Sequence, residues 1–318
     1  MKELKRISAF FMAMLMMLTV FSAFSVVSAE GEAAGGTQPV WPAQGSIKLD
    51  KDAAAVAGKE NLWEVTLGIQ GKNFETTSDV VLVIDNSNSM YENDRMVQTK
   101  AAANAFVDAL LTQDSATRIA VVVFNDKVEQ TGFYDYSNKE ALKAYINAVS
   151  MNEDDGGTFT QLGIKTARDL LKSSASTGLN KNIVLLSDGL PTWSYLATGT
   201  ATGTCTTWLF GTITHNDGYD KNTVKVNGCN YNVQKGNGTS ADDGSIELLL
   251  TCEHDVTATE IFKISHSYAT IWEAQQAAND GMTVFSIALQ AGTTGENVLR
   301  ACATNPATAV SYTHLTLP

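Results

Sequence analysis

The chain has 318 residues, a formal net charge of −12 and a hydrophobic content of 44%. Its length exceeds one average domain, and this hydrophobic fraction is sufficient for a packed core. The acidic balance argues against nucleic acid as a partner and against electrostatic docking on anionic lipid, because both carry negative charge.

Residues 1–29 have the pattern of a signal peptide. Lys2, Lys5 and Arg6 form a basic start, a long apolar run follows, and Val27-Ser28-Ala29 offers small residues before a cleavage point. Cleavage would remove three basic residues and one acidic residue, which changes the net charge from −12 to −14. A retained anchor is the alternative, because the apolar run is long enough to span a bilayer. In either case we expect the remainder of the chain to be exported.

Residues 30–77 combine a leader with a small β unit. The segment 30–42 is small and polar and predicts a flexible leader. Ser46–Leu49 and Leu62–Ile69 alternate apolar and polar residues, which is typical of half-buried strands.

From residue 78 to 309, strand-like apolar runs alternate with helical patterns. This alternation predicts an α/β fold, a doubly wound and mostly parallel sheet flanked by helices. The expected strands cover 80–85, 118–124, 127–133 (antiparallel, at the edge), 182–188 and 282–289, and the expected helices cover 95–111, 138–149, 161–173, 266–280 and 296–303.

A segment at about 193–266 interrupts this alternation. It is rich in Thr, Gly and Asn and far exceeds the usual length of a loop. Asn227-Gly228 lies between alternating flanks in Val224–Val233, so we expect a β-hairpin with a type I′ turn there. The sequence therefore predicts a β-rich insertion.

Four cysteines are present: Cys205, Cys229, Cys252 and Cys302. An even number in an exported chain suggests two disulfides, and Cys205 with Cys229 is the first expectation because both lie in the insertion. No C-x-x-C motif occurs and the histidines are scattered, so a zinc site is not expected.

Polar oxygen-bearing side chains follow two of the predicted buried strands. The strand 80–85 ends in Asp85-Asn86-Ser87-Asn88-Ser89, and the strand 182–188 ends in Ser187-Asp188-Gly189. Open α/β sheets bind ligands at the carboxyl ends of their strands, and hard cations such as Mg²⁺ prefer oxygen ligands. Two hydroxyls add coordination without adding charge, so a cation held there would stay electrophilic.

Together with Gly156-Gly157-Thr158-Phe159-Thr160, these segments resemble the metal-ion-dependent adhesion site of von Willebrand factor type A domains. The resemblance covers roughly residues 78–305. It implies that Asp85, Ser87 and Ser89 supply the first metal loop, Thr158 the second and Asp188 the third. Thr160 is a weaker alternative to Thr158. The implied cofactor is a divalent cation, by default Mg²⁺, with Mn²⁺ or Ca²⁺ as alternatives.

The same resemblance implies a function in adhesion. The open metal position would accept an acidic side chain of an extracellular protein ligand, such as a host matrix or cell-surface protein. The leader and β unit resemble those preceding this domain in Gram-positive surface and pilus adhesins. There Lys51 would be a conceivable isopeptide lysine, although an ordinary exposed lysine is the stronger expectation. Inserted arms occur in related pilus-tip adhesins, so Trp193, Tyr195, Trp208 and Phe210 are candidates for partner contact, although packing of the insertion core is equally expected for each.

Two other functional classes remain open. One is a structural pilin or shaft subunit that contacts other pilus subunits, and the other is a secreted metal-dependent hydrolase. We do not expect an enzyme, because no G-x-S-x-G elbow, P-loop or dinucleotide motif occurs. His215, His254 and His266 have no placed nucleophile, and Glu153-Asp154-Asp155 is expected to be a solvated loop.

The last residues, 310–318, continue no periodic pattern. They resemble the translation of a sequencing-library adapter, so we expect a non-native tail on a truncated chain, with an ordinary disordered tail as the alternative. In the first case any later domain and wall anchor would lie outside this sequence.

Overall fold

The computed structural model describes residues 47–59, 63–71, 77–113, 115–150, 156–174, 180–207, 213–252 and 257–312. The expected signal segment and leader, the acidic run Glu153–Asp155, Trp208, Phe210 and His254 lie outside these ranges. The chain divides into two compact units with a boundary at residue 77. In the described part of the chain, no helix is both long and apolar enough to cross a membrane.

The first unit contains an antiparallel pair of strands. β1 (Ile47–Ala55) pairs with β2 (Trp63–Gly71) along its whole length. The two strands expected from the alternating pattern are present, and both are longer than expected. Lys51 lies in β1 opposite Leu67, and its side chain is outside the described part of the structure.

The second unit is built on a six-stranded sheet in the order β13–β12–β6–β3–β4–β5. All neighbouring pairs are parallel except β4 and β5, so the doubly wound α/β expectation is confirmed. The strands are β3 (Ser78–Asp85), β4 (Arg118–Phe124), β5 (Val128–Gln130), β6 (Asn180–Ser187), β12 (Thr283–Leu289) and β13 (Ala309–Tyr312).

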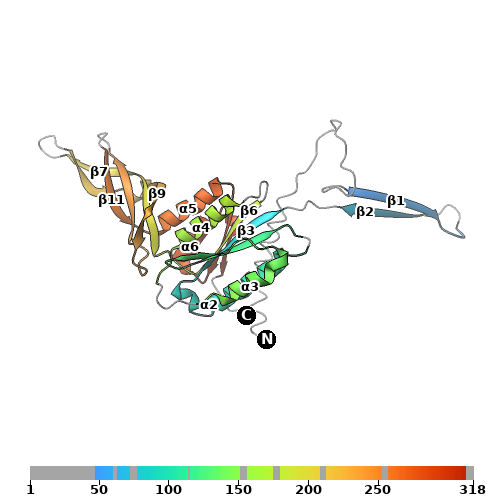
Figure 1. Cartoon of the computed structure of the whole chain (residues 1–318). Helices are drawn as coiled ribbons and strands as arrows, with labels where there is room; N and C mark the ends of the chain where they lie inside the picture. Colours follow the sequence, from blue (N-terminus) through green and yellow to red (C-terminus); the bar gives the residue numbers. More distant parts are fainter. Residues whose placement is uncertain are drawn as a thin grey trace. The chain divides into compact units, whose positions relative to one another are not determined.

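Helices cover both faces of this sheet (Figure 1). α2 (Arg95–Leu110) and α3 (Lys139–Ala148) pack on one face, where Ile84 belongs to the core cluster. α4 (Thr160–Ser173), α5 (Ser267–Asn279) and α6 (Gly292–Cys302) pack on the other, where Val83 belongs to the second cluster. Because successive strand residues point to opposite faces, the continuous apolar run of β3 is buried on both sides.

The insertion forms a second β-sheet that extends away from α4 and α5 (Figure 1). It contains β7 (Trp193–Thr207), β8 (Ile213–Tyr219), β9 (Lys225–Gly236), β10 (Gly244–Thr251) and β11 (Thr257–Ile264). β11, β10, β7 and β8 are neighbours in that order, and β9 also pairs with β7. The expectation of a β-rich insertion agrees with this sheet.

The hairpin expected at Asn227-Gly228 is wrong. Both residues lie inside the continuous strand β9, where Gly228 is opposite Thr198 of β7. The register of this pairing shifts between Thr198 and Gly199, so the Asn-Gly signal marks an irregularity of the ladder and not a turn. A Cβ at position 228 would lie 2.8 Å from the Thr198 Oγ1 atom, which explains the glycine.

The expected disulfide between Cys205 and Cys229 is also wrong. Cys229 and Cys302 are free thiols, whereas Cys252 is disulfide-bonded. On β7, Cys205 is opposite His215 of β8, while Cys229 of β9 is opposite Ala197. Eight residues of strand separate these positions by about 26 Å, far beyond the reach of a disulfide. Two disulfides would use all four cysteines, so the expectation of two is wrong as well, because Cys229 and Cys302 are free.

No regular element was expected from residue 310, but β13 begins at Ala309 and pairs in parallel with the second half of β12. Residues 310–312 therefore continue the main sheet as an edge strand, and 313–318 lie outside the described residues.

Candidate metal centre

Asp85 ends β3 at the carboxyl edge of the main sheet and is fully buried. Its Oδ1 atom accepts a hydrogen bond from the Ser87 backbone N–H at 2.9 Å. Its Oδ2 atom accepts one from the Ser187 hydroxyl at the end of the neighbouring strand β6. These two bonds fix the carboxylate, so the side chains that follow β3 and β6 meet at this edge.

Ser87, Ser89 and Asp188 continue from Asp85 as a chain of oxygen atoms. The hydroxyl oxygens of Ser87 and Ser89 are 3.2 Å apart, and the Ser89 hydroxyl donates to the Asp188 Oδ1 atom at 2.9 Å. The 3-10 turn η2 (Asn88–Tyr91) curls the first loop back so that Ser89 reaches the loop after β6. Four of the five predicted site residues are thus joined by direct polar contacts.

The spacing of these oxygens fits a small divalent cation. In an octahedral Mg²⁺ site with metal–oxygen distances of about 2.0–2.1 Å, neighbouring ligand oxygens are separated by about 2.8–3.0 Å. For a Ca²⁺ ion with distances of about 2.3–2.6 Å, the same geometry gives about 3.3–3.7 Å. The observed separation of 2.9 Å lies in the Mg²⁺ range, and that of 3.2 Å lies between the two ranges.

The electrostatics of the site also favour a cation. Burial, and then the negative charge of Asp188, raise the pKa of Asp85 to about 7. Burial raises the pKa of Asp188 as well, against the lowering effects of the Ser89 hydrogen bond and the Arg95 charge. Burial disfavours the ionised forms of both carboxylates, and a positive charge between them would stabilise those forms.

Arg95 is a residue of the site that the sequence did not reveal. Its Nη1 atom donates to the Asp188 Oδ2 atom at 2.9 Å and to the Ser89 carbonyl at 2.8 Å. Asn93 and Asp94 have positive φ angles and turn the chain sharply before α2, which places this first helical side chain beside Asp188. Arg95 therefore holds one oxygen of Asp188 and leaves the other for the serine chain.

Thr158 lies in a neighbouring loop but makes no direct side-chain bond to the other four among the described contacts. It is 6% exposed, and its backbone N–H donates to the Thr192 hydroxyl at 2.8 Å. Its carbonyl accepts the backbone N–H groups of Thr192 and Trp193 at the start of β7. Thr160 is the first residue of α4, and its buried hydroxyl has no hydrogen-bond partner within the described part of the chain.

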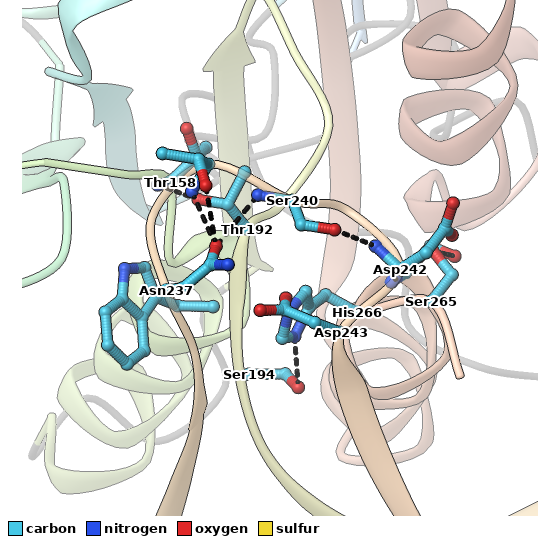
Figure 2. Close-up of polar contacts among 12 residues, drawn as sticks. Thr158, Thr192, Ser194, Asn237, Ser240, Asp242, Asp243, Ser265 and His266 are labelled. Carbon is cyan, nitrogen blue, oxygen red and sulfur yellow. Dashed lines mark hydrogen bonds and ion pairs between the residues drawn. The ribbon is translucent and has the colours of Figure 1, made fainter. Parts of the chain in front are cut away.

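The insertion therefore begins against the loop of Thr158 (Figure 2). Gly157 has φ +104°, and a Cβ there would lie 2.6 Å from the Trp193 Nε1 atom and 2.7 Å from the Gly238 Cα atom. Only glycine lets this loop pass so close to the insertion.

The aromatic candidates for partner contact differ in their surroundings. Tyr195 is 7% exposed, with its ring 5.0 Å from Phe159 and 5.1 Å from Tyr231 between centroids, so it packs the base of the insertion. Trp193 is half-buried against Gly156 and Gly157.

A Ser–His–Asp arrangement that the sequence did not predict joins the insertion to α5 (Figure 2). The Ser194 hydroxyl lies 2.8 Å from His266 Nδ1, and His266 Nε2 lies 2.7 Å from Asp243 Oδ1. Ser194 is 2% exposed and His266 is fully buried, so a substrate has no approach to the hydroxyl. We interpret this arrangement as a structural joint. In the described residues, no group of three or more His, Cys, Asp or Glu side chains could hold a metal ion.

Residues 79–202 match the family model of the von Willebrand factor type A domain. The matched segment includes β3 from its second residue onward and the loop after β6. This segment of the chain is similar to von Willebrand factor type A domains. Domains of this family commonly bind a divalent cation, in agreement with an oxygen-lined site at the carboxyl ends of β3 and β6.

Relatives of this domain occur in bacterial pili. The chain is 35% identical over 160 residues to the minor fimbrium subunit Mfa5 of Porphyromonas gingivalis, an alignment that covers 47% of this chain and 12% of that protein. The chain thus spans only a small part of the curated relative that it matches.

Solved structures show the same fold at low sequence identity. The pilus adhesin SpaC from Lactobacillus rhamnosus GG matches with a TM-score of 0.59 and 17% identity, over 91% of this chain and 35% of that one. The von Willebrand factor domain of the type V pili tip protein Mfa5 from Porphyromonas gingivalis matches with a TM-score of 0.51 and 21% identity, over 75% of this chain and 90% of that one. The chain is therefore similar in fold to domains of pilus adhesins.

Proposed function

We propose that this chain is an exported cell-surface or pilus-associated adhesion protein. Its von Willebrand factor type A domain would bind a protein ligand through a divalent cation. The observation that carries the proposal is the run of oxygen atoms from Ser87 through Ser89 to Asp188, spaced as neighbouring ligands of one small cation. The pilus proteins among its relatives support the same setting.

Ser87, Ser89 and Asp188 would hold the cation, together with Thr158 from the second loop. Asp85 would orient the first loop through its hydrogen bond to the Ser87 N–H, or would reach the cation through water. The cation, when bound, supplies an electrostatic attraction for a carboxylate of the ligand. Arg95 strengthens this attraction, because it neutralises much of the charge of Asp188 and leaves the cation less compensated. Mg²⁺ is the proposed ion, and Mn²⁺ and Ca²⁺ are the alternatives to compare.

The test replaces Asp85 with asparagine. Asparagine keeps an oxygen for the Ser87 N–H and can still bond the Ser187 hydroxyl, so the fold should persist. We expect Asp85→Asn to lose Mg²⁺ binding in calorimetry and to lose EDTA-sensitive binding to immobilised extracellular-matrix proteins. Asp169→Asn is the matched control, because Asp169 is an exposed carboxylate on α4 away from the site.

Two outcomes would reject the proposal. One is adhesion that chelation and Asp85→Asn leave unchanged. The other is a wild-type chain that binds no divalent cation at millimolar concentration while its circular dichroism shows a folded domain.

A further inference from the structure

A cavity of about 510 Å³ lies beside the metal centre at the carboxyl ends of β3 and β4. Its walls come from the end of β3, the β4–β5 hairpin and the last turn of α3. The lining residues are Asn86, Val123, Phe124, Asn125, Lys127, Val128, Glu129, Tyr145, Ala148, Val149 and Ser150. Several of them are exposed, so the cavity opens to solvent on the face that carries the metal loops.

The cavity and the metal centre share one strand end. Ile84 faces the helices α2 and α3, whereas Val83 faces α4. With this alternation continued, Asp85 points to the α4 side and Asn86 to the α3 side, where the cavity lies. Neighbouring residues at the end of β3 therefore face the candidate metal centre and the cavity.

Asn86 is held in a fixed orientation at the cavity wall. Its amide nitrogen donates to the Ser150 carbonyl at 3.1 Å, and its oxygen accepts the Tyr91 hydroxyl at 2.6 Å. It is 9% exposed. A wall built this way is preformed, which reduces the ordering cost of a ligand that enters.

The chemistry of the walls favours an uncharged occupant that is partly apolar. Val123 and Val149, which pack in the core cluster on the α3 side, supply apolar surface, and the ring of Tyr145 adds an aromatic side. Two amides and a serine supply polar atoms. The only charged residues of the lining, Lys127 and Glu129, have opposite signs, so neither a cation nor an anion is favoured.

We propose that this cavity binds an aromatic side chain with a hydrogen-bonding group, such as tyrosine, on the same ligand segment whose carboxylate reaches the metal. This inference deepens the proposed function and rests on it. Tyrosine and tryptophan join a large apolar surface to a polar tip, and they commonly fill pockets as interface anchors. In an extended ligand, side chains two residues apart project to the same face about 6.6 Å apart, so one segment can present both a carboxylate and an aromatic side chain to this edge of the sheet.

The first experiment tests the cavity without the metal. N-acetyl-L-tyrosinamide is titrated to millimolar concentration into the purified chain with EDTA, and backbone amide shifts are followed by NMR. We expect shifts at Asn86, Tyr145 and Val149. Ala148→Phe, which fills the cavity from its exposed rim, should abolish them. Ala144→Phe, an exposed position on the same helix outside the lining, should not.

The second experiment tests the link to the metal. Capped peptides Gly-Tyr-Gly-Glu-Gly-Tyr-Gly, the same with both tyrosines as alanine, and the same with glutamine for glutamate are titrated with Mg²⁺ present. We expect the tyrosine peptide to bind about tenfold more tightly than the alanine peptide, a modest anchor effect. Ala148→Phe should remove this advantage, and Ala144→Phe should keep it.

The outcomes separate the two proposals. Absence of tyrosinamide shifts at the cavity, or equal affinity of the tyrosine and alanine peptides, overturns the cavity proposal even if both peptides bind with Mg²⁺. If the tyrosinamide shifts occur but no peptide depends on Mg²⁺ and glutamate, the proposed function fails and the link proposed here fails with it.

Discussion

At the scale of single residues, the buried carboxylate of Asp85 determines how the stability of the domain depends on pH near the candidate metal centre. Its carboxylate is buried next to that of Asp188, and its pKa of about 7 lies far above the ordinary value of 3.8. Between pH 3.8 and about pH 7, the Asp85 carboxylate of the metal-free domain therefore takes up a proton when the chain folds. This group's contribution to stability is complete below about pH 4 and is lost as the pH rises through 7.

This sign gives a pH prediction. In EDTA, the free energy of unfolding should fall from pH 5 to pH 8 by up to a few kcal/mol, and Mg²⁺ should restore it at pH 8. Urea denaturation across this range measures the effect. Asp85→Asn should show a flatter profile, and a wild-type profile parallel to that of the variant would contradict the prediction.

Ser89 bridges Ser87 and Asp188, so its hydroxyl is the central oxygen of the site. Ser89→Ala should weaken Mg²⁺ binding by at least about tenfold with little change in melting temperature, because only a half-buried hydroxyl is lost. Calorimetry measures the affinity. Ser173→Ala on the exposed end of α4 is the control, and equal affinities in the two variants would argue against Ser89 as a ligand.

Asp85, Ser87, Ser89 and Asp188, which the family resemblance proposes as ligands, are joined by polar contacts because the ends of neighbouring parallel strands meet at one edge. Sequence patterns do not predict the contacts of Arg95 and Ser187 with these residues. Arg95 depends on two consecutive positive φ angles at Asn93 and Asp94, which non-glycine residues seldom adopt. Ser187 bonds Asp85 across two strands, a contact that depends on their exact register. Local patterns carry neither type of information.

At the scale of elements, sequence patterns predict the strands and helices of the main domain within a few residues, except the edge strand β13. Buried strands such as Arg118–Phe124 and amphipathic helices such as Arg95–Leu110 have strong periodic signals. The strands of the insertion are harder to predict, because an Asn-Gly pair suits both a turn and a ladder irregularity. Pairing with the long strand β7 selects the irregularity at Gly228.

The loop before α4 gives a prediction at this scale. Gly157→Ala forces the loop of Thr158 away from Trp193 and Gly238, because the backbone there is left-handed and crowded. We expect weaker Mg²⁺ binding together with a loss of stability above 1 kcal/mol. Gly132→Ala is the control, since a Cβ there meets nothing within 4 Å. Unchanged Mg²⁺ affinity in Gly157→Ala would remove Thr158 from the proposed ligands.

At the scale of the whole second unit, the insertion is joined to the main domain through buried charge. Glu273 of α5 is fully buried; its Oε1 accepts Arg168 Nη1 of α4 at 2.9 Å, and its Oε2 accepts the Tyr231 hydroxyl of β9 at 2.7 Å. Sequence patterns do not predict this joint, since its three members come from distant segments and each resembles an ordinary polar residue.

Removal of this joint should be costly. Glu273→Ala leaves Arg168 with Asp280 alone and leaves the Tyr231 hydroxyl without its acceptor, so we expect a loss of about 3 kcal/mol in the free energy of unfolding. Chemical denaturation is the measurement. Glu140→Ala, an exposed carboxylate on α3, should cost less than about 1 kcal/mol. A Glu273→Ala cost as small as that of the control would show that the joint does not stabilise the fold.

The long strand β7 has a mechanical consequence. Its 15 residues extend for about 50 Å, and its first residue, with Thr192 before it, is hydrogen-bonded to the carbonyl of Thr158. A pulling force on the far end of the insertion would run down this strand and reach the main domain at the loop of Thr158. Under the proposed function, tension on the insertion and attachment to the ligand would therefore act on the same few backbone bonds.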